Sequence, residues 1–397
     1  MTKTVNAGEL QKAVAEAGLD GWLLYDFRGT NPLARSVLGL DQLPTGSRRW
    51  FYLVLPHSAP IKIVHGIETE ALDSLPGERK IYRSYTDLKN ALAESLKPLK
   101  KVAMEYAPLA GNPYISRIDA GTIELIRACG PEVVSSGDLI QKFAATLSEE
   151  QFETHLAADA VTRTGFEKSW EFIEQQIRST GQVSEQEVCK LILDHFEASG
   201  MTTYSPPIVA RQPNNRFPHY ETGHGQDTMI RAGDLVLIDM WCKAKTPHAI
   251  YSDISKMAYV GQDIPSAYSE AFALVIQARD TGLNLIQERC QAGEVLAGWE
   301  VDRAVRKVIA DAGKQQYFLH RTGHSLGEEV HSNGAHLDDY EMHEERTLLP
   351  STLMTIEPGL YQETFGLRSE INVFINQNNQ VQVTGGPIQN EIQQISI

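Results

Sequence analysis

The sequence lacks the features that mark a secreted or membrane-spanning protein. Its four cysteines (Cys129, Cys189, Cys242 and Cys290) are far apart and form no CxxC pair, so buried thiols in a reducing compartment are expected rather than disulfides. No apolar run approaches the ~20 residues that a membrane span requires. The N-terminal stretch has no apolar core of the signal-peptide type. We therefore expect a cytoplasmic protein.

Basic residues are also scarce. There are 36 Lys and Arg against 51 Asp and Glu, which gives a formal net charge of −15 at pH 7. Nucleic acids and anionic membranes are recognised by basic surfaces, so neither is an expected partner. The 397 residues, 42% of them apolar, suffice for two domains with sizeable cores.

The N-terminal part contains no phosphate loop and no glycine-rich dinucleotide turn. Short strand patterns alternate there with helical patterns, which predicts a small α/β domain. The strand patterns cover 21–27, 50–55, 61–65 and 101–105, and the helical ones 10–17, 86–97 and 122–128. Between 143 and 150 the short alternating strand and helix patterns give way to longer helical patterns, so domains are expected at 1–147 and 148–397.

The C-terminal part has longer helical patterns. Four helices are expected at 149–176, 184–200, 267–290 and 299–312. Ser184 and Glu187 form the signature of a capping box at the start of the second helix. Strands are expected near 206–211, 235–260, 353–362 and 366–384. Helices in one group and antiparallel strands in another indicate the α+β class.

Two carboxylates stand in the most informative stretch. Residues 235–238 form an apolar strand pattern that ends at Asp239, and a second strand pattern over 249–260 carries Asp253. The segment 243–247 between them is expected to be a solvated turn. Ionised carboxylates in apolar surroundings require a cation or hydrogen-bond donors. From these two residues alone, a metal site and two carboxylates facing water remain equally open.

Three further candidate ligands follow. His324 lies in HRTGHSLG, where two glycines allow the backbone to approach closely; Glu357 precedes a Pro-Gly turn, and Glu370 lies inside a strand pattern. Carboxylate oxygens with one imidazole suit Mn²⁺, Fe²⁺, Co²⁺ or Zn²⁺, and bridging carboxylates could hold a pair of ions. There is no HExxH motif of the helical zinc proteases. Taken singly, each residue is more commonly a core, surface or turn residue.

The order of the five residues and their flanking segments resembles a known family. GDLVLID, YSD, GH, TIEPGLY and GLRSE are similar to the motifs of the pita-bread (creatinase-fold) metallopeptidases. That family includes Xaa-Pro dipeptidases (prolidases), Xaa-Pro aminopeptidases and methionine aminopeptidases. The resemblance is strong over 148–385 and extends to 1–147 in length and α/β texture. It implies a catalytic pita-bread domain that follows a smaller creatinase-type N-terminal domain.

The resemblance also implies a cofactor and a role for each ligand. Two divalent ions per chain are expected, with manganese first and cobalt, zinc or iron as alternatives. Asp239 would bind one ion, His324 and Glu357 the other, and Asp253 and Glu370 would bridge them. A hydroxide held between the ions would attack the scissile carbonyl, and Glu357 would accept the proton of the attacking water.

Four more residues receive roles by the same resemblance. His219 and His331 would hydrogen-bond the substrate carbonyl and stabilise the oxyanion. His320 would line the proline pocket, and Arg368 would pair with a metal-site carboxylate or a substrate carboxylate. His224 competes for the role of His219.

The sequence departs from the family pattern in places. Asp239 and Asp253 are fourteen positions apart, farther than is usual, which implies a longer hairpin. Ser325 replaces the usual glycine after the ligand histidine, and Ser332 replaces an acidic residue. His336 and His343 are expected in loops or at the surface.

The implied function is hydrolysis of the Xaa-Pro bond, and dipeptides are the leading hypothesis for the substrate. The partner would be a small peptide with proline at its second position, and a homodimer is the family expectation. An aminopeptidase acting on longer peptides is the second hypothesis. A non-peptidase hydrolase or lyase of the same fold is the third, and a non-catalytic binding module the fourth. The complete ligand set counts against the last two, because buried carboxylate clusters are costly without a cation.

Overall fold

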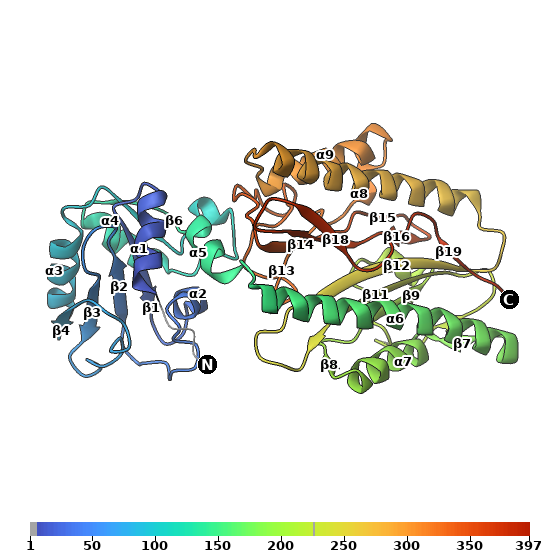
Figure 1. Cartoon of the computed structure of the whole chain (residues 1–397), viewed down its shortest axis with the longest axis horizontal. Helices are drawn as coiled ribbons and strands as arrows, with labels where there is room; N and C mark the ends of the chain where they lie inside the picture. Colours follow the sequence, from blue (N-terminus) through green and yellow to red (C-terminus); the bar gives the residue numbers. More distant parts are fainter. Residues whose placement is uncertain (1–5, 225–226) are drawn as a thin grey trace. The chain divides into compact units, whose positions relative to one another are not determined.

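The computed structural model describes residues 6–224 and 227–397. It divides into two compact units, Met1–Ala144 and Ala145–Ile397 (Figure 1). The sequence placed the division between 147 and 148. No helix in the described ranges has the length and hydrophobicity needed to cross a bilayer.

The smaller unit is built on a six-stranded sheet in the order β4-β3-β2-β1-β5-β6. Side chains of β1 alternate between two cores, with Trp22 and Leu24 in one and Leu23 and Tyr25 in the other, as expected for a sheet covered on both faces. The strands are β1 (Gly21–Asp26), β2 (Trp50–Val54), β3 (Ile61–His65), β4 (Glu78–Tyr82), β5 (Lys101–Met104) and β6 (Glu132–Ser135). The helices are α1 (Ala7–Glu16), α2 (Pro32–Val37), α3 (Tyr85–Leu96), α4 (Ala120–Ala128) and α5 (Gly137–Ala144), with the 3₁₀ turn η1 (Pro108–Ala110).

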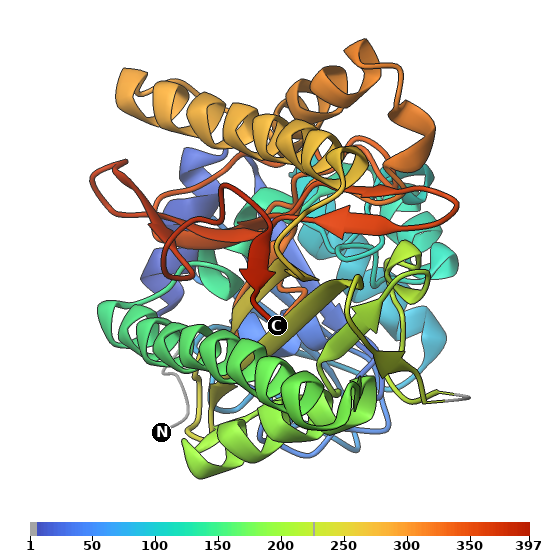
Figure 2. The same cartoon turned by 90° about the vertical axis from the view of Figure 1, so that its right-hand side faces the viewer.

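The larger unit is layered. Its helices are α6 (Glu149–Thr180), α7 (Glu185–Ala198), α8 (Ser266–Ala292) and α9 (Gly298–Asp311), with the 3₁₀ turns η2 (Asn214–Arg216) and η3 (Gln315–Tyr317). Figures 1 and 2 show α6 and α7 on one outer side and α8 and α9 on the other, with the strands between them. The predicted capping box is present, because Ser184 and Glu187 exchange hydrogen bonds at the start of α7.

Two main sheets fill the space between these helices. The first has the order β19-β12-β11-β8, with β9 also paired to β11, and the second has the order β13-β14-β17-β18. Short pairs β10-β7 and β15-β16 complete the set. The strands are β7 (Val183–Ser184), β8 (Met201–Thr202), β9 (Ile208–Arg211), β10 (Met229–Ile230), β11 (Leu235–Ala244), β12 (Ser252–Val260), β13 (Ser325–Leu326), β14 (Thr352–Ile356), β15 (Gly359–Tyr361), β16 (Gly366–Arg368), β17 (Ile371–Ile375), β18 (Val381–Thr384) and β19 (Gln393–Ile395).

Strand β11 extends beyond Asp239, the end that the sequence pattern predicted for it. β11 continues to Ala244, so that expected end was wrong, because apolar residues follow Asp239 on the buried faces. Lys243 is half-buried with its Nζ 4.9 Å from the centre of the Tyr251 ring. The prediction of a solvated turn was therefore wrong at Lys243.

The register of this hairpin sets which side chains meet. Asp239 pairs with Ser255 and Trp241 pairs with Asp253. Because side chains alternate along a strand, these four residues share one face of the hairpin.

The second sheet brings two glutamates together. Ile356 of β14 pairs with Ile371 of β17, so Glu357 and Glu370 stand next to each other just beyond the paired ends. Glu370 lies between β16 and β17 rather than inside a continuous strand. The predicted strand is interrupted there because the chain passes from the β15-β16 pair to the main sheet.

Gly323 allows the loop before β13 to approach β14 closely. A Cβ atom at this position would lie 2.0 Å from the Thr355 carbonyl oxygen. The neighbouring His324 donates from its N–H to Thr355 Oγ1 at 3.0 Å and accepts from the Thr355 N–H at 2.9 Å. The close approach predicted from the two glycines of this motif is present.

We predict that Gly323→Ala destabilises the larger unit by about 1–3 kcal/mol, because the added methyl group cannot be accommodated without moving backbone. Denaturant unfolding of the variant and the wild type measures the effect. Gln277→Ala, on an exposed position of α8, is the control and is expected to stay within about 0.5 kcal/mol of wild type. An unchanged midpoint for Gly323→Ala would contradict the packing argument.

Candidate metal centre

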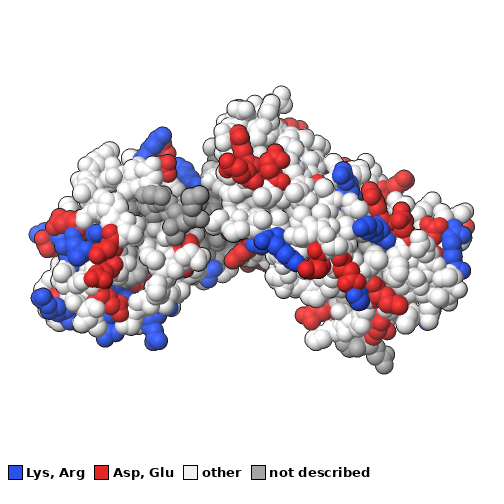
Figure 3. Space-filling view, turned by 60° about the horizontal axis from the view of Figure 1, so that its bottom comes forward, with Lys and Arg blue, Asp and Glu red and all other residues white. Residues whose placement is uncertain are grey.

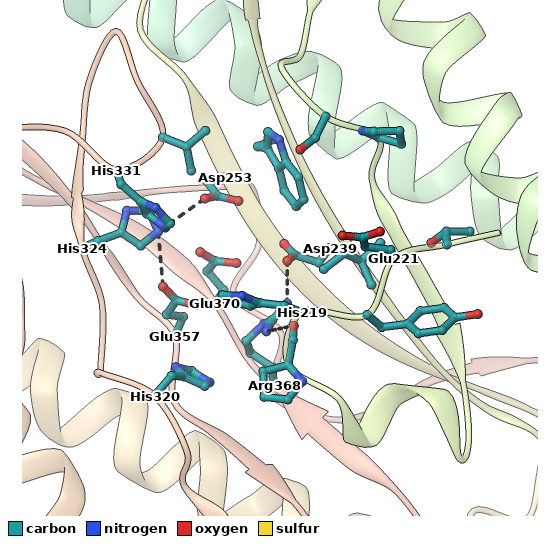
Figure 4. A pocket seen from close by; sticks show the side chains of 18 of the residues that line it. His219, Glu221, Asp239, Asp253, His320, His324, His331, Glu357, Arg368 and Glu370 are labelled. Atoms are coloured by element: carbon teal, nitrogen blue, oxygen red, sulfur yellow. Dashed lines mark hydrogen bonds and ion pairs between the residues drawn. The ribbon is translucent and has the colours of Figure 1, made fainter. Parts of the chain in front are cut away.

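The five predicted ligands line one pocket of the larger unit. The β11–β12 hairpin supplies Asp239 and Asp253, and the loop before β13 supplies His324. Glu357 follows β14 and Glu370 precedes β17. Figure 4 shows these side chains converging from the two sheets. The cavity has a volume of about 980 Å³.

His324 lies against two of the carboxylates. Its Nε2 is 3.5 Å from Asp253 Oδ2 and 3.3 Å from Glu357 Oε1. Its Nδ1 lies 3.2 Å from the Ser325 carbonyl oxygen, which leaves Nε2 turned toward the carboxylates. One potential ligand atom each from Asp253, His324 and Glu370 lies within 4.8 Å of the other two.

Burial and mutual repulsion disfavour charge in this cluster. Burial is the largest cause that raises the pKa of Asp253 and of Glu370 well above the usual carboxyl range, and neighbouring carboxylates add to it. Burial also raises the pKa of Glu357 and lowers the pKa of His324. A bound cation would favour the ionised carboxylates and the neutral imidazole together.

Asp239 provides a direct test of whether the residues fit a metal. Its Oδ2 accepts from Arg368 at 2.5 Å. Its Oδ1 is buried and has no hydrogen-bond partner among the described residues. A buried carboxylate oxygen without a partner is costly, and a cation would satisfy it. Four carboxylates and one imidazole are the donors that manganese, iron, cobalt and zinc accept, so the residues fit.

Arg368 organises one end of the site. Besides Asp239, its guanidinium donates to Ser255 Oγ at 2.8 Å, the Tyr361 hydroxyl at 3.1 Å and the Pro218 carbonyl at 3.3 Å. Of the two pairings expected for Arg368, the structure therefore contains the one with a metal-site carboxylate.

The three predicted pocket histidines have different surroundings. His320 is held between the Tyr361 hydroxyl and the Arg321 carbonyl, at 2.8 Å from each, and burial lowers its pKa to about 3. The His331 ring stands at 85° to that of His324, with centroids 4.4 Å apart. Charge on His324, followed by burial, lowers the pKa of His331 to about 2. His219 also lines the pocket and is exposed to it.

The remaining histidines near the site differ in their exposure to solvent. His224 lies at the pocket rim, where its Nδ1 is 2.9 Å from Glu221 Oε2 and its side chain is largely exposed. His343 is at the surface beside Asp339, as expected. His336 lies in the loop between β13 and β14, one of the two places expected for it, but it is not at the surface. It is fully buried, and its Nδ1 accepts from the Ser325 N–H at 3.0 Å, because the segment after His331 folds back onto the ligand loop.

The sequence interpretation missed many residues of the pocket region, and four of them contribute to the arguments below. Ser255 follows Asp253 by two positions and shares its face, and its hydroxyl donates to Glu370 Oε2 at 2.9 Å; strand alternation was the available signal. Tyr361 stands inside the quoted segment TIEPGLY. Trp241 and Tyr204 also line the pocket. Trp241 follows Asp239 by two positions, so strand alternation was a signal for it too, whereas no residue pattern indicated Tyr204.

Comparisons with known proteins agree with this geometry. The model of metallopeptidase family M24 matches residues 153–377. The chain belongs to metallopeptidase family M24. Membership implies divalent metal ions, in line with the ligand cluster.

Individual relatives support the same assignment. An uncharacterized peptidase of Bacillus subtilis, YqhT, is 29% identical over 259 residues, which are 64% of this chain and 67% of that protein. The Xaa-Pro dipeptidase of Pyrococcus horikoshii is 30% identical over 182 residues, 45% of this chain and 46% of that enzyme. The chain thus matches about half the length of that dipeptidase.

A solved structure matches nearly the whole chain. The dipeptidase PepE of Mycobacterium ulcerans superposes with a TM-score of 0.67 at 20% identity, covering 98% of this chain and 97% of that one. The fold is the two-part pita-bread architecture, as the resemblance implied.

We predict that divalent metal stabilises the metal-free protein, because it neutralises carboxylates that repel one another. Adding Mn²⁺ at 100 times its Kd should stabilise the folded chain by about 2.7 kcal/mol. Thermal unfolding with and without Mn²⁺, Co²⁺ or Zn²⁺ measures the shift. Glu370→Gln should reduce it, whereas Glu270→Gln, at an exposed position of α8, should not. The absence of any shift would contradict the metal assignment.

Proposed function

We propose that the chain is a dinuclear metallopeptidase that hydrolyses the bond before a proline at the second position of small peptides. Dipeptides are its proposed main substrates. The observation that carries the proposal is the buried Oδ1 of Asp239, without a partner in the described structure, within a cluster of four carboxylates and one histidine. Two divalent ions, manganese first, would be held by Asp239, Asp253, His324, Glu357 and Glu370.

The chain's own residues have distinct tasks in this proposal. Bound divalent ions would polarise the scissile carbonyl and lower the pKa of water. The Glu357 carboxylate accepts the proton of the attacking water. Thr355 Oγ1 orients this carboxylate by donating to Glu357 Oε1 at 3.2 Å. His219 and His331 hydrogen-bond the carbonyl oxygen as negative charge develops on it.

The proline side of the peptide is assigned to the end of the pocket at Arg368. His320 and Tyr361 lie there and contact each other. With its pKa lowered to about 3, His320 is neutral at physiological pH and contributes no charge beside the pyrrolidine ring. The relative from Pyrococcus horikoshii is an Xaa-Pro dipeptidase, which supports this substrate.

The proposed ligand is a small peptide, and neither nucleic acid nor an anionic membrane is proposed as a partner. Acidic and basic side chains are interspersed on the face shown in Figure 3, and the net charge is −15. Nucleic acids and anionic membranes would favour a continuous basic surface. The homodimer and the cytoplasmic location stay predictions.

A substrate panel tests the proposal. The metal-stripped protein is assayed with Mn²⁺, Co²⁺ and Zn²⁺ restored separately, on a Xaa-Pro dipeptide, a Xaa-Pro tripeptide and a peptide that starts with Met. Cleavage of the dipeptide but not the tripeptide is the expected result. Cleavage of the tripeptide would move the assignment to an aminopeptidase. No cleavage by metal-loaded protein would favour a non-peptidase hydrolase or lyase of the same fold.

We predict that His331→Ala cuts kcat by roughly 10²–10³, the usual effect of losing one oxyanion donor, and leaves bound metal unchanged. Steady-state kinetics and metal analysis measure the two effects separately. His343→Ala, a surface histidine paired with Asp339, is the control for replacing a histidine. A loss of metal from His331→Ala would show that His331 is a ligand instead.

A further inference from the structure

An aromatic wall, which we define as Trp241, Tyr204 and Tyr251, stands beside the metal centre. Trp241 is directly across from Asp253 in the β11–β12 ladder, so its indole occupies the face that carries the ligands. The Tyr204 and Trp241 rings are stacked with centroids 5.8 Å apart and planes 28° apart. Tyr251 meets Tyr204 edge-on at 6.4 Å. None of these rings has a role in the chemistry proposed above.

The wall presents an apolar surface to the pocket. Trp241 and Tyr204 both line the pocket together with Ile208 and Val330. Tyr204 is 65% exposed, which is unusual for a large aromatic side chain packed against another ring. Exposed aromatic surface of this kind gains free energy when an apolar group covers it.

Trp241 also has an unsatisfied polar atom. Its Nε1 is buried and lacks a hydrogen-bond partner within the described ranges, although the side chain lines the pocket. A buried indole N–H normally finds an acceptor. The described protein groups therefore leave the hydrogen bonding of Trp241 incomplete, while its ring lines the pocket.

The two ends of the pocket differ in polarity. His320, Tyr361 and the guanidinium of Arg368 form one end, where Arg368 reaches Asp239. Trp241 is two residues farther along β11 and faces Asp253. A peptide whose scissile carbonyl lies over the carboxylates therefore places its two residues toward different ends. With proline at the polar end, the residue before proline meets the wall.

We propose that the aromatic wall binds the side chain of the residue before proline and makes large apolar and aromatic side chains the preferred ones there. This inference rests on the proposed function.

Hydrolysis of Phe-Pro, Leu-Pro, Gly-Pro and Asp-Pro by the metal-loaded protein tests the inference. The quantity compared is the ratio of kcat/KM for Phe-Pro to that for Gly-Pro. We expect this ratio to exceed ten in the wild type and to fall roughly tenfold or more in Trp241→Ala, since an apolar contact of this size discriminates by about that factor. Trp241→Phe keeps an aromatic ring and should retain most of the ratio.

Two more variants keep the test decisive. Tyr204→Ala removes an exposed side chain, so it should fold even if Trp241→Ala does not, and it should lower the same ratio. Tyr85→Ala, an exposed aromatic residue of α3 in the smaller unit, is the matched control and should leave the ratio unchanged.

The outcomes distinguish a failure of this inference from a failure of the proposed function on which it rests. A wild type that cleaves the dipeptides but prefers Gly-Pro or Asp-Pro, or a ratio insensitive to both Trp241→Ala and Tyr204→Ala, would overturn the aromatic wall alone. A wild type that cleaves none of the four would overturn the proposed function and the wall with it.

Discussion

The burial of four carboxylates around one histidine is the constraint on which the rest of the larger unit depends. Burial raises the pKa of Asp253, Glu357 and Glu370, so the chain must either protonate these groups or bring positive charge to them. Arg368 supplies one such charge to Asp239. Divalent ions would supply the remainder. The fold can therefore be understood as a frame that keeps these side chains together despite their repulsion.

That frame works because no single element carries the whole site. The hairpin fixes Asp239 and Asp253 by register, and the second sheet fixes Glu357 and Glu370 at the paired ends of β14 and β17. His324 is tied to β14 by two hydrogen bonds with Thr355. Residues between 239 and 370 in the sequence meet in one place because two sheets, each backed by helices, face each other there.

The sequence singled out the five candidate ligands better than the pocket around them. Each candidate stands in a short flanking motif, and the structure gathers all five in one pocket. The burial of His336 was not predicted, because it comes from a loop that folds back onto the Ser325 N–H, a contact with no local sequence pattern. Strand β4 was missed because most of its residues are exposed. Trp241 lies beyond the predicted end of the strand at Asp239, and the observed continuation of β11 and its pairing with Asp253 place it at the site.

The asymmetry of the pocket then determines how a substrate would lie. The Arg368 guanidinium donates to four protein groups at the end near Asp239, which makes that end rigid before a peptide arrives. At the other end, Tyr204 is exposed and the Trp241 N–H lacks an acceptor in the described structure. A preorganised end favours a rigid ring such as proline, because little further ordering is needed on binding. An incomplete aromatic end gains most from a side chain that covers it, so in the proposed function the two ends together would orient the peptide across the carboxylates.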